Sequence, residues 1–205
     1  MPSGKQKDNS TIDRKVALRR QALRHVPTDA PILETHGGYG RIFDRVYHRH
    51  TAGVVLEKDD RKVALLARQR PTWRVYHGLA EKALAAGLAR DMAFAFVDLD
   101  PYGSPFDVLD AFFQAGRQFA PRLELVVNDG MRNKVRVGSA WHVHCLREIV
   151  ERYGNDLLGV YLDVAREMVA TLAQRVGYAI TAWKGYYCGS NNDITHYWAT
   201  LEAAR

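Results

Sequence analysis

The sequence predicts an α/β protein whose core is a mostly parallel, seven-stranded sheet with helices on both faces. From Ala30 to Asp129, short apolar segments rich in β-branched residues alternate with segments of helical period, as in βαβ units. Residues 92–100, "MAFAFVDLD", have the continuous apolar character of a strand buried at the centre of a parallel sheet. Two β-rich runs around Gly-Ser-Asn-Asn-Asp close the chain and predict an antiparallel hairpin.

The N-terminal segment is expected to add one basic helix to this domain. Residues 1–12 are polar and are predicted to form a disordered tail, so that the single domain comprises residues 13–205. Val16, Leu18 and Val26 recur among arginines and lysines, which predicts a basic amphipathic helix. We interpret it as a solvated helix that caps the domain, and an arm that faces phosphates is the alternative.

Each later element is assigned from its period and from the signals at its ends. Asp59 precedes one amphipathic run as a helix cap, and Ser104 with Pro105 begins another helix. The predicted strands are residues 30–36, 52–60, 72–78, 92–100, 122–129, 178–190 and 194–203. The predicted helices are residues 12–26, 41–50, 61–70, 79–90, 104–118, 143–154 and 159–177.

Composition and charge restrict the class of protein. The chain has 205 residues, of which 47% are hydrophobic and 25% charged, the balance of a folded domain. It has no apolar run of the ~20 residues that cross a bilayer, no apolar N-terminal stretch typical of a secretory signal, and only two cysteines. We therefore expect a cytoplasmic protein that does not enter a membrane. The net charge of +6 favours a polyanionic partner such as nucleic acid.

A glycine-rich turn, "ETHGGYGR", follows the first predicted strand. Its glycines let the backbone approach a ligand, but their spacing is not the G-x-G-x-x-G dinucleotide fingerprint, which argues against a nicotinamide oxidoreductase. Glu34 suits the ammonium group of an amino-acid ligand, although a tight turn without a ligand is the alternative. The candidate binding residues are Glu34, Thr35, His36, Gly37, Gly38 and Gly40.

Glu57 ends the second predicted strand and precedes Lys58. An acid at this place in an open α/β sheet can accept hydrogen bonds from both hydroxyls of a ribose. An ordinary charge at the end of a strand is the alternative. Together with the glycine-rich turn, Glu57 indicates a nucleoside-containing ligand.

The fourth predicted strand ends in "DLDPYGSP", at the edge where ligands bind in open α/β sheets. Asp100 can accept a hydrogen bond from an amino group, the carbonyl of Pro101 can accept a second, and the ring of Tyr102 can stack on a base. Methylation of an exocyclic amine needs such acceptors, because the lone pair of the amine is delocalised into the base. A turn that only ends the strand is the alternative.

This motif resembles the catalytic motif of the tRNA guanine-N2 dimethyltransferases, which are class I S-adenosylmethionine (SAM)-dependent methyltransferases. It is more loosely similar to the Asp/Asn-Pro-Pro-Tyr/Phe motif of the DNA amino-methyltransferases. The close likeness covers Asp98 to Pro105, and the order of elements is similar over about residues 30–203. The resemblance implies a Rossmann-like class I methyltransferase fold with SAM as the cofactor.

The resemblance also implies a role for each candidate residue. Glu34, Gly37, Gly38 and Gly40 would contact the methionine part of SAM, and Glu57, beside Lys58, would contact the ribose. The turn with Gly78 and Leu79 would contact the adenine, and Asp98 would line the pocket. The implied catalytic residues are Asp100, Pro101 and Tyr102.

Two further groups of residues were considered for binding. Basic residues after the fifth strand and asparagines in the hairpin would contact the nucleic acid, with a solvated loop as the alternative for the basic ones. These candidates are Arg132, Lys134, Arg136, Asn191 and Asn192. In "WHVHC", His142, His144 and Cys145 lack the spacing of a standard metal site, so no metal is expected.

The sequence thus favours an N-methyltransferase that acts on an exocyclic amine of a nucleic-acid base, with RNA favoured over DNA. Three alternatives remain: a DNA amino-methyltransferase, a non-catalytic SAM- or RNA-binding subunit of a larger enzyme, and a small-molecule N-methyltransferase. A second copy of the chain or a partner subunit would supply target recognition.

Overall fold

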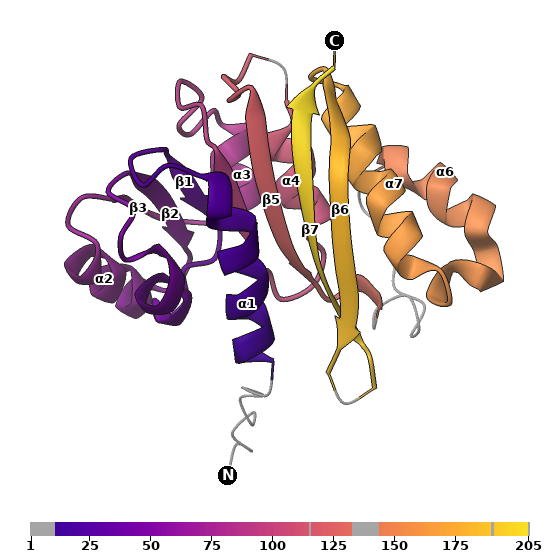
Figure 1. Ribbon diagram of the computed structural model, residues 1–205, viewed down its shortest axis with the longest axis horizontal. Coiled ribbons are helices and arrows are strands. Elements are labelled where there is room, and N and C mark those ends of the chain that lie inside the picture. The colour runs from indigo at the N-terminus through magenta and orange to yellow at the C-terminus, as the bar shows by residue number, and fades with distance from the viewer. Residues whose placement is uncertain (1–10, 115, 133–143, 190, 205) are drawn as a thin grey trace.

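A computed structural model of the chain describes residues 11–114, 116–132, 144–189 and 191–204, with the side chains of residues 144–146 left out. One sheet of seven strands has the order β3-β2-β1-β4-β5-β7-β6 (Figure 1). The strands are β1 (Ile32–Glu34), β2 (Gly53–Glu57), β3 (Arg74–His77), β4 (Phe96–Leu99), β5 (Arg122–Asp129), β6 (Tyr178–Cys188) and β7 (Ile194–Ala203). The first five are parallel, and β7 is antiparallel to both β5 and β6. The predicted α/β sheet with its closing hairpin is therefore confirmed.

The helices follow the predicted order, with differences in length. They are α1 (Ile12–Ala22), α2 (Asp60–Gln69), α3 (Ala80–Ala85), α4 (Phe106–Phe112), α6 (His144–Tyr153) and α7 (Tyr161–Gln174). The described residues also form two 3-10 turns, Leu23–His25 and Gly154–Leu158, and a π-helical turn, Phe43–Tyr47. Asp59 caps α2 as predicted, because its side chain accepts from the amides of Arg61 and Lys62. Helix α3 is shorter than predicted because Gly87, at φ +88°, leaves the helical conformation.

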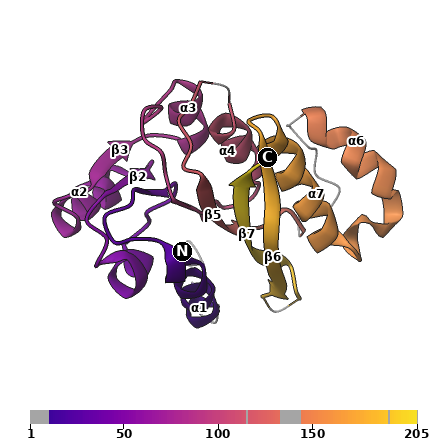
Figure 2. The same ribbon diagram turned by 45° about the horizontal axis from the view of Figure 1, so that its top comes forward.

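The sheet divides the core into two layers. Helices α3, α4 and α7 cover one face, and α1, α2 and the turn Phe43–Tyr47 cover the other (Figure 1, Figure 2). Alternation along the strands supplies both layers, since Ile32 and Val55 face the α1 side while Leu33 faces the other. All three side chains are fully buried.

Helix α1 is more than a solvated cap. Val16, Leu18 and Ala22 are buried in the layer that it shares with β4 and β5, and the side chain of Arg19 is buried with them. Ile12 already belongs to α1, and the rest of the predicted tail, residues 1–10, lies outside the described residues. In the described part of the chain, every helix is too short or too polar to span a membrane.

Candidate functional site

The carboxyl ends of β1 to β4 meet at one edge of the sheet, because these strands are parallel and adjacent. Among the described residues, the exposed large hydrophobic side chains are those of Tyr39, Leu79 and Tyr102, at 51%, 38% and 102% of their full exposure. They lie in the loops that follow β1, β3 and β4, respectively. Exposed apolar groups gathered at one edge are typical of a binding site for flat or apolar ligands.

Glu57 at the end of β2 holds the glycine-rich turn. Its Oε2 accepts from the amide of Gly38 at 2.8 Å, and its Oε1 accepts from the amides of Lys58 and Asp59 at 2.8 and 3.1 Å. A carboxylate has about four acceptor positions, so these amides fill about three. Within the described part of the chain, one position on Oε2 remains for a ligand donor such as a ribose hydroxyl.

The glycines beside Glu57 have different surroundings. A Cβ at Gly37 would lie 2.5 Å from Val55 and 2.7 Å from Leu66, so this glycine permits close packing of the turn against β2 and α2. A Cβ at Gly38 or Gly78 would meet no atom of the described residues within 4 Å. Open space therefore lies at Gly38 and at Gly78, whose amides donate to the side chain and to the carbonyl of Glu57, respectively. Gly40, with φ +75°, lies against the side chain of Gln69.

Glu34 is buried at the end of β1, where its carboxylate accepts a hydrogen bond from Nη1 of Arg70. Burial raises the pKa of Glu34 to about 7, although the guanidinium of Arg70 opposes this shift. Arg70 in turn lies over the ring of Phe43 at 4.3 Å. The structure thus joins Glu34 to the end of α2, and its contact with the amino-acid part of a cofactor stays a prediction.

Thr35 and His36 connect β1 to the end of β4. The amide of Thr35 donates to the carbonyl of Asp98 at 3.0 Å, and its hydroxyl lies 2.8 Å from Nδ1 of His36. Burial lowers the pKa of His36, while the charges of Asp100 and Glu57 oppose that shift. His36 is therefore a neutral imidazole near both carboxylates at neutral pH.

Asp98, within β4, accepts hydrogen bonds from two elements of the α1 face. Arg19 donates to Oδ1 at 2.6 Å and to Oδ2 at 2.8 Å, and the hydroxyl of Tyr47 donates to Oδ2 at 2.5 Å. Burial alone would lower the pKa of Arg19, but the carboxylate of Asp98 raises the pKa of Arg19 above its usual value. The side chain of Asp98 joins α1 and the turn Phe43–Tyr47 to the sheet, and its predicted place in a cofactor pocket remains untested.

Asp100, immediately after β4, has a different set of partners. Nζ of Lys15 lies 2.9 Å from both carboxylate oxygens, and Nδ2 of Asn128 donates to Oδ1. Burial would raise the pKa of Asp100, but Lys15, Arg19 and Asn128 together lower it to about 2. Asp100 is therefore an ionised acceptor at neutral pH, and its side chain remains 26% exposed.

Pro101 and Tyr102 form the turn beyond Asp100. The carbonyl of Pro101 accepts from the amide of Gly103 at 3.0 Å, so part of its accepting capacity is used within the turn. Gly130 donates to the carbonyl of Gly103 at 3.1 Å, which fastens this turn to the loop after β5. The side chain of Tyr102, two residues after Asp100, is fully exposed.

The structure brings Arg132 to the hairpin through contacts within the protein. Its guanidinium lies 4.2 Å from the ring centre of Tyr187 and donates to the carbonyl of Asn192 and, at 3.3 Å, to that of Leu158. Asn191 and Asn192 are exposed. Lys134, Arg136 and His142 lie outside the described residues, as do the side chains of His144 and Cys145, so their predicted roles stay open.

Several residues around Asp100 escaped the sequence analysis. Lys15 and Arg19 come from α1, and Asn128 comes from β5. His196 of β7, paired in register with Asn128, has its pKa lowered to about 3 by burial and by Lys15 and Arg19. The i, i+4 spacing of Lys15 and Arg19 was a usable signal, because it places both on one side of the helix. This spacing does not reveal that the partners of the two cations are Asp100 and Asp98.

Comparisons with solved structures support the fold. The protein Trm1 from Pyrococcus horikoshii, in a complex with S-adenosyl-L-methionine, matches 95% of this chain with 17% identity and a TM-score of 0.67. The N-methyltransferase NodS from Bradyrhizobium japonicum, in a complex with S-adenosyl-L-homocysteine, matches 97% of this chain and 90% of its own, with 10% identity and a TM-score of 0.62. The putative methyltransferase YhhF from Escherichia coli matches 94% of this chain and 86% of its own, with 14% identity and a TM-score of 0.58.

These likenesses show that the chain has the Rossmann-like class I methyltransferase fold. The chain spans about half the length of Trm1, of which 55% is covered. Comparison of the sequence with protein-family models and with curated proteins gives no match. The likeness therefore concerns architecture, and activity must be argued from the site.

Proposed function

We propose that this protein is a SAM-dependent N-methyltransferase that acts on an exocyclic amine of a nucleic-acid base, with RNA favoured over DNA. The observation that carries the proposal is the pairing of Asp100 with Tyr102. An ionised carboxylate, anchored by Lys15 and Asn128, is followed two residues later by a fully exposed aromatic ring at the carboxyl edge of the sheet. This combination can hold an amino group by a hydrogen bond and the ring that bears it by stacking.

The residues beside β1 to β3 fit the nucleoside part of SAM. Among the described residues, the donors to Glu57 leave one acceptor position for a ribose hydroxyl, and there is space at Gly38 and Gly78. Leu79 offers an exposed apolar surface to an adenine ring. When bound, SAM supplies an electrophilic methyl group. The known ligands of Trm1 and NodS accord with this assignment.

The chain contributes mainly by positioning the target amine. Transfer is a direct displacement at the methyl carbon, so alignment of the amine with the donor supplies most of the catalysis. Asp100 accepts a hydrogen bond from the amine and so localises its lone pair. With a pKa of about 2, Asp100 is a weak base, and the proton released after transfer passes on to solvent.

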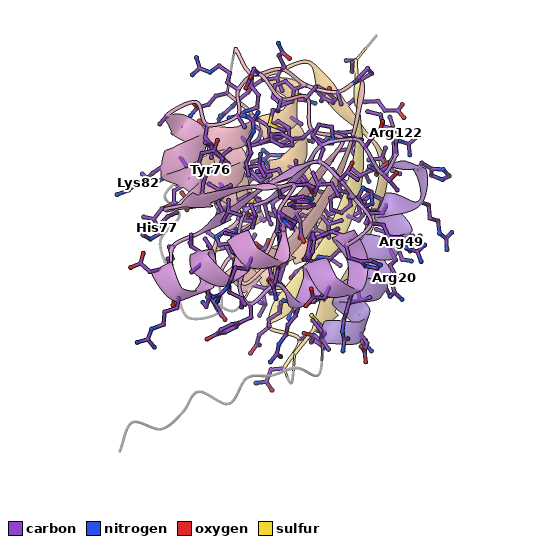
Figure 3. All side chains as sticks on the ribbon, turned by 90° about the vertical axis from the view of Figure 1, so that its left-hand side faces the viewer. Arg20, Arg49, Tyr76, His77, Lys82 and Arg122 are labelled. Atoms are coloured by element: carbon purple, nitrogen blue, oxygen red, sulfur yellow. The ribbon has the colours of Figure 1, made fainter. Side chains whose placement is uncertain are left out.

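The charge around α1 supports a polyanionic substrate. Exposed arginines lie on α1, on the turn that follows it and on the segment around Phe43–Tyr47: Arg14, Arg20, Arg24, Arg45 and Arg49. Figure 3 shows Arg20 and Arg49 pointing outward on the same side of the molecule, opposite His77 and Lys82. Arg14 also lies over the ring of Tyr186, 5.9 Å from its centre, which extends the basic surface to the hairpin. Such a surface can contact the phosphates of a polynucleotide. A base in a helical region would then have to be flipped out to reach Tyr102.

The proposal is tested by calorimetric titration with SAM and with NAD, followed by transfer of labelled methyl groups to tRNA, other RNA, DNA and small amines. We expect SAM binding, no NAD binding and labelling of RNA. Labelling of DNA alone would replace RNA by DNA, and labelling of small amines alone would contradict a nucleic-acid substrate. SAM binding without transfer to any acceptor would favour a non-catalytic subunit, with a second copy or a partner required for activity.

A further inference from the structure

The proposed function leaves open why an N-terminal basic helix lies against the end of β4. Two cations of α1, Lys15 and Arg19, are four residues apart, which is a rise of about 6 Å along a helix. Asp98 and Asp100 are two residues apart on an extended chain, a separation of about 6.6 Å. The two spacings match, and each cation meets its own carboxylate.

We propose that Lys15 is a positioning residue of the active site, which fixes the carboxylate of Asp100 so that one oxygen faces the target amine. This inference rests on the proposed function. The symmetric contact of Nζ with both carboxylate oxygens, 2.9 Å each, fixes the plane of the carboxylate together with Asn128. Lys15 and Asn128 fill the two acceptor positions of Oδ1. Among the residues that the structure describes, Lys15 is the donor to Oδ2, which leaves one position there for an amine N–H.

The surroundings of Asp100 make Lys15 the dominant cation. Among the described residues, the titratable groups that interact with the charge of Asp100 include Lys15 and Arg19 from α1, His36 from the loop after β1, and His196 from β7. Arg19 is engaged by Asp98, and burial keeps both histidines neutral at neutral pH. Lys15 alone among these groups combines a positive charge with direct contact to Asp100, so its removal would leave a half-buried carboxylate with one amide donor.

The first test measures the pKa of Asp100 by NMR of its carboxyl carbon. The signal is assigned from its absence in Asp100→Asn. In Lys15→Met we expect the pKa of Asp100 to rise by about 1 to 3, since a cation within bonding distance has that effect. Lys15→Arg keeps the charge and should leave most of the shift in place. Lys184→Met is the matched control, because Lys184 is exposed and donates to Gln21 on the same helix without touching Asp100.

The second test is methyl transfer by the full chain between pH 4 and 8. Lys15→Met should lower kcat by about tenfold to a hundredfold at neutral pH, because misplacement of the acceptor disturbs alignment. The acid limb of its pH–rate profile should move to higher pH, because the pKa of Asp100 is higher in this variant. The dissociation constant for SAM should stay within about twofold of the wild-type value, since SAM would lie over β1 to β3. Lys15→Arg should recover most of kcat, and Lys184→Met should match the wild type.

The two tests separate failure of this inference from failure of the proposed function. An unchanged pKa of Asp100 in folded Lys15→Met protein would overturn the role of Lys15 whatever the activity shows. A shifted pKa with unchanged kcat and an unmoved acid limb would also overturn it, because Lys15 would then be a purely structural cation. Absence of methyl transfer by the wild-type protein would instead contradict the proposed function.

Discussion

Two carboxylates at the end of β4, Asp98 and Asp100, face the same helix and have opposite characters. The side chain of Asp98 is 2% exposed and accepts hydrogen bonds from Arg19 and Tyr47. Asp100, two residues on, has a side chain that is 26% exposed and a free acceptor position beyond Lys15. The first pair is shielded from solvent and joins α1 to the sheet, while the second is partly open to solvent.

The difference comes from where the strand ends. Asp98 lies within the ladder, where neighbouring strands and α1 exclude water, and a buried charge there requires complete pairing. Asp100 lies just past the last residue of β4, where the chain turns away at Pro101. Two acids of one motif therefore differ in their surroundings, one buried against α1 and the other partly exposed at the edge of the sheet.

The largest effect is expected where the buried pair is broken. Arg19→Met should lower the free energy of unfolding by about 3–5 kcal/mol, because it leaves the carboxylate of Asp98 buried with Tyr47 as its remaining side-chain partner. Urea denaturation measures this, with the exposed Arg20→Met as the control on the same helix. A loss of less than about 1 kcal/mol would mean that α1 does not depend on the pair.

Asp100→Asn should act on catalysis and leave the fold intact. The amide that replaces the carboxylate cannot offer an anionic acceptor, so methyl transfer should fall by about a hundredfold or more. SAM affinity, measured by calorimetry, should change little. If SAM binding is lost instead, Asp100 belongs to the cofactor site and its assignment to the target amine is wrong.

A smaller effect is expected from Tyr102, which lies beyond the partly exposed pair. Tyr102→Ala should raise KM for the nucleic acid about fivefold to a hundredfold, because stacking of one base contributes about 1–3 kcal/mol. The free energy of unfolding should stay the same, since the ring is fully exposed. Tyr102→Phe retains the ring and should behave like the wild type. Equal KM values for all three proteins would place the target base elsewhere.

The smallest effect concerns acid stability. The pKa of Asp100 lies at about 2, below its ordinary value of 3.8, so its contribution to stability is present above about pH 4 and is lost as the pH falls toward 2. Between pH 4 and pH 2, the unfolding free energy of the wild type should therefore fall by about 1–2 kcal/mol more than that of Asp100→Asn. Urea titrations at several pH values measure it, with Asp13→Asn as the exposed control. Identical pH dependence in wild type and Asp100→Asn would contradict the ion pair.

Much of the site was accessible from the sequence because its signals are local. The alternation of apolar strands and helices placed the turns at Glu34, Glu57 and Asp100 on one edge, and the sheet order confirms that these turns meet there. Hydrogen bonds between distant segments were inaccessible. Arg70 lies 36 residues from Glu34, and Asn128 lies 28 residues from Asp100.

The sequence by itself determined the α/β pattern, the closing hairpin, the cap at Asp59 and the exposed turn after β4, since each depends on neighbouring residues. The tertiary structure alone decided which carboxylate is buried and which is partly exposed. That choice depends on helix α1, whose Lys15 lies 85 residues from Asp100 in the chain. Hydrophobic packing of Val16, Leu18 and Ala22 sets the position of the helix along the sheet. In that position Lys15 and Arg19, four residues apart on the helix, lie opposite Asp100 and Asp98, two residues apart on the extended chain.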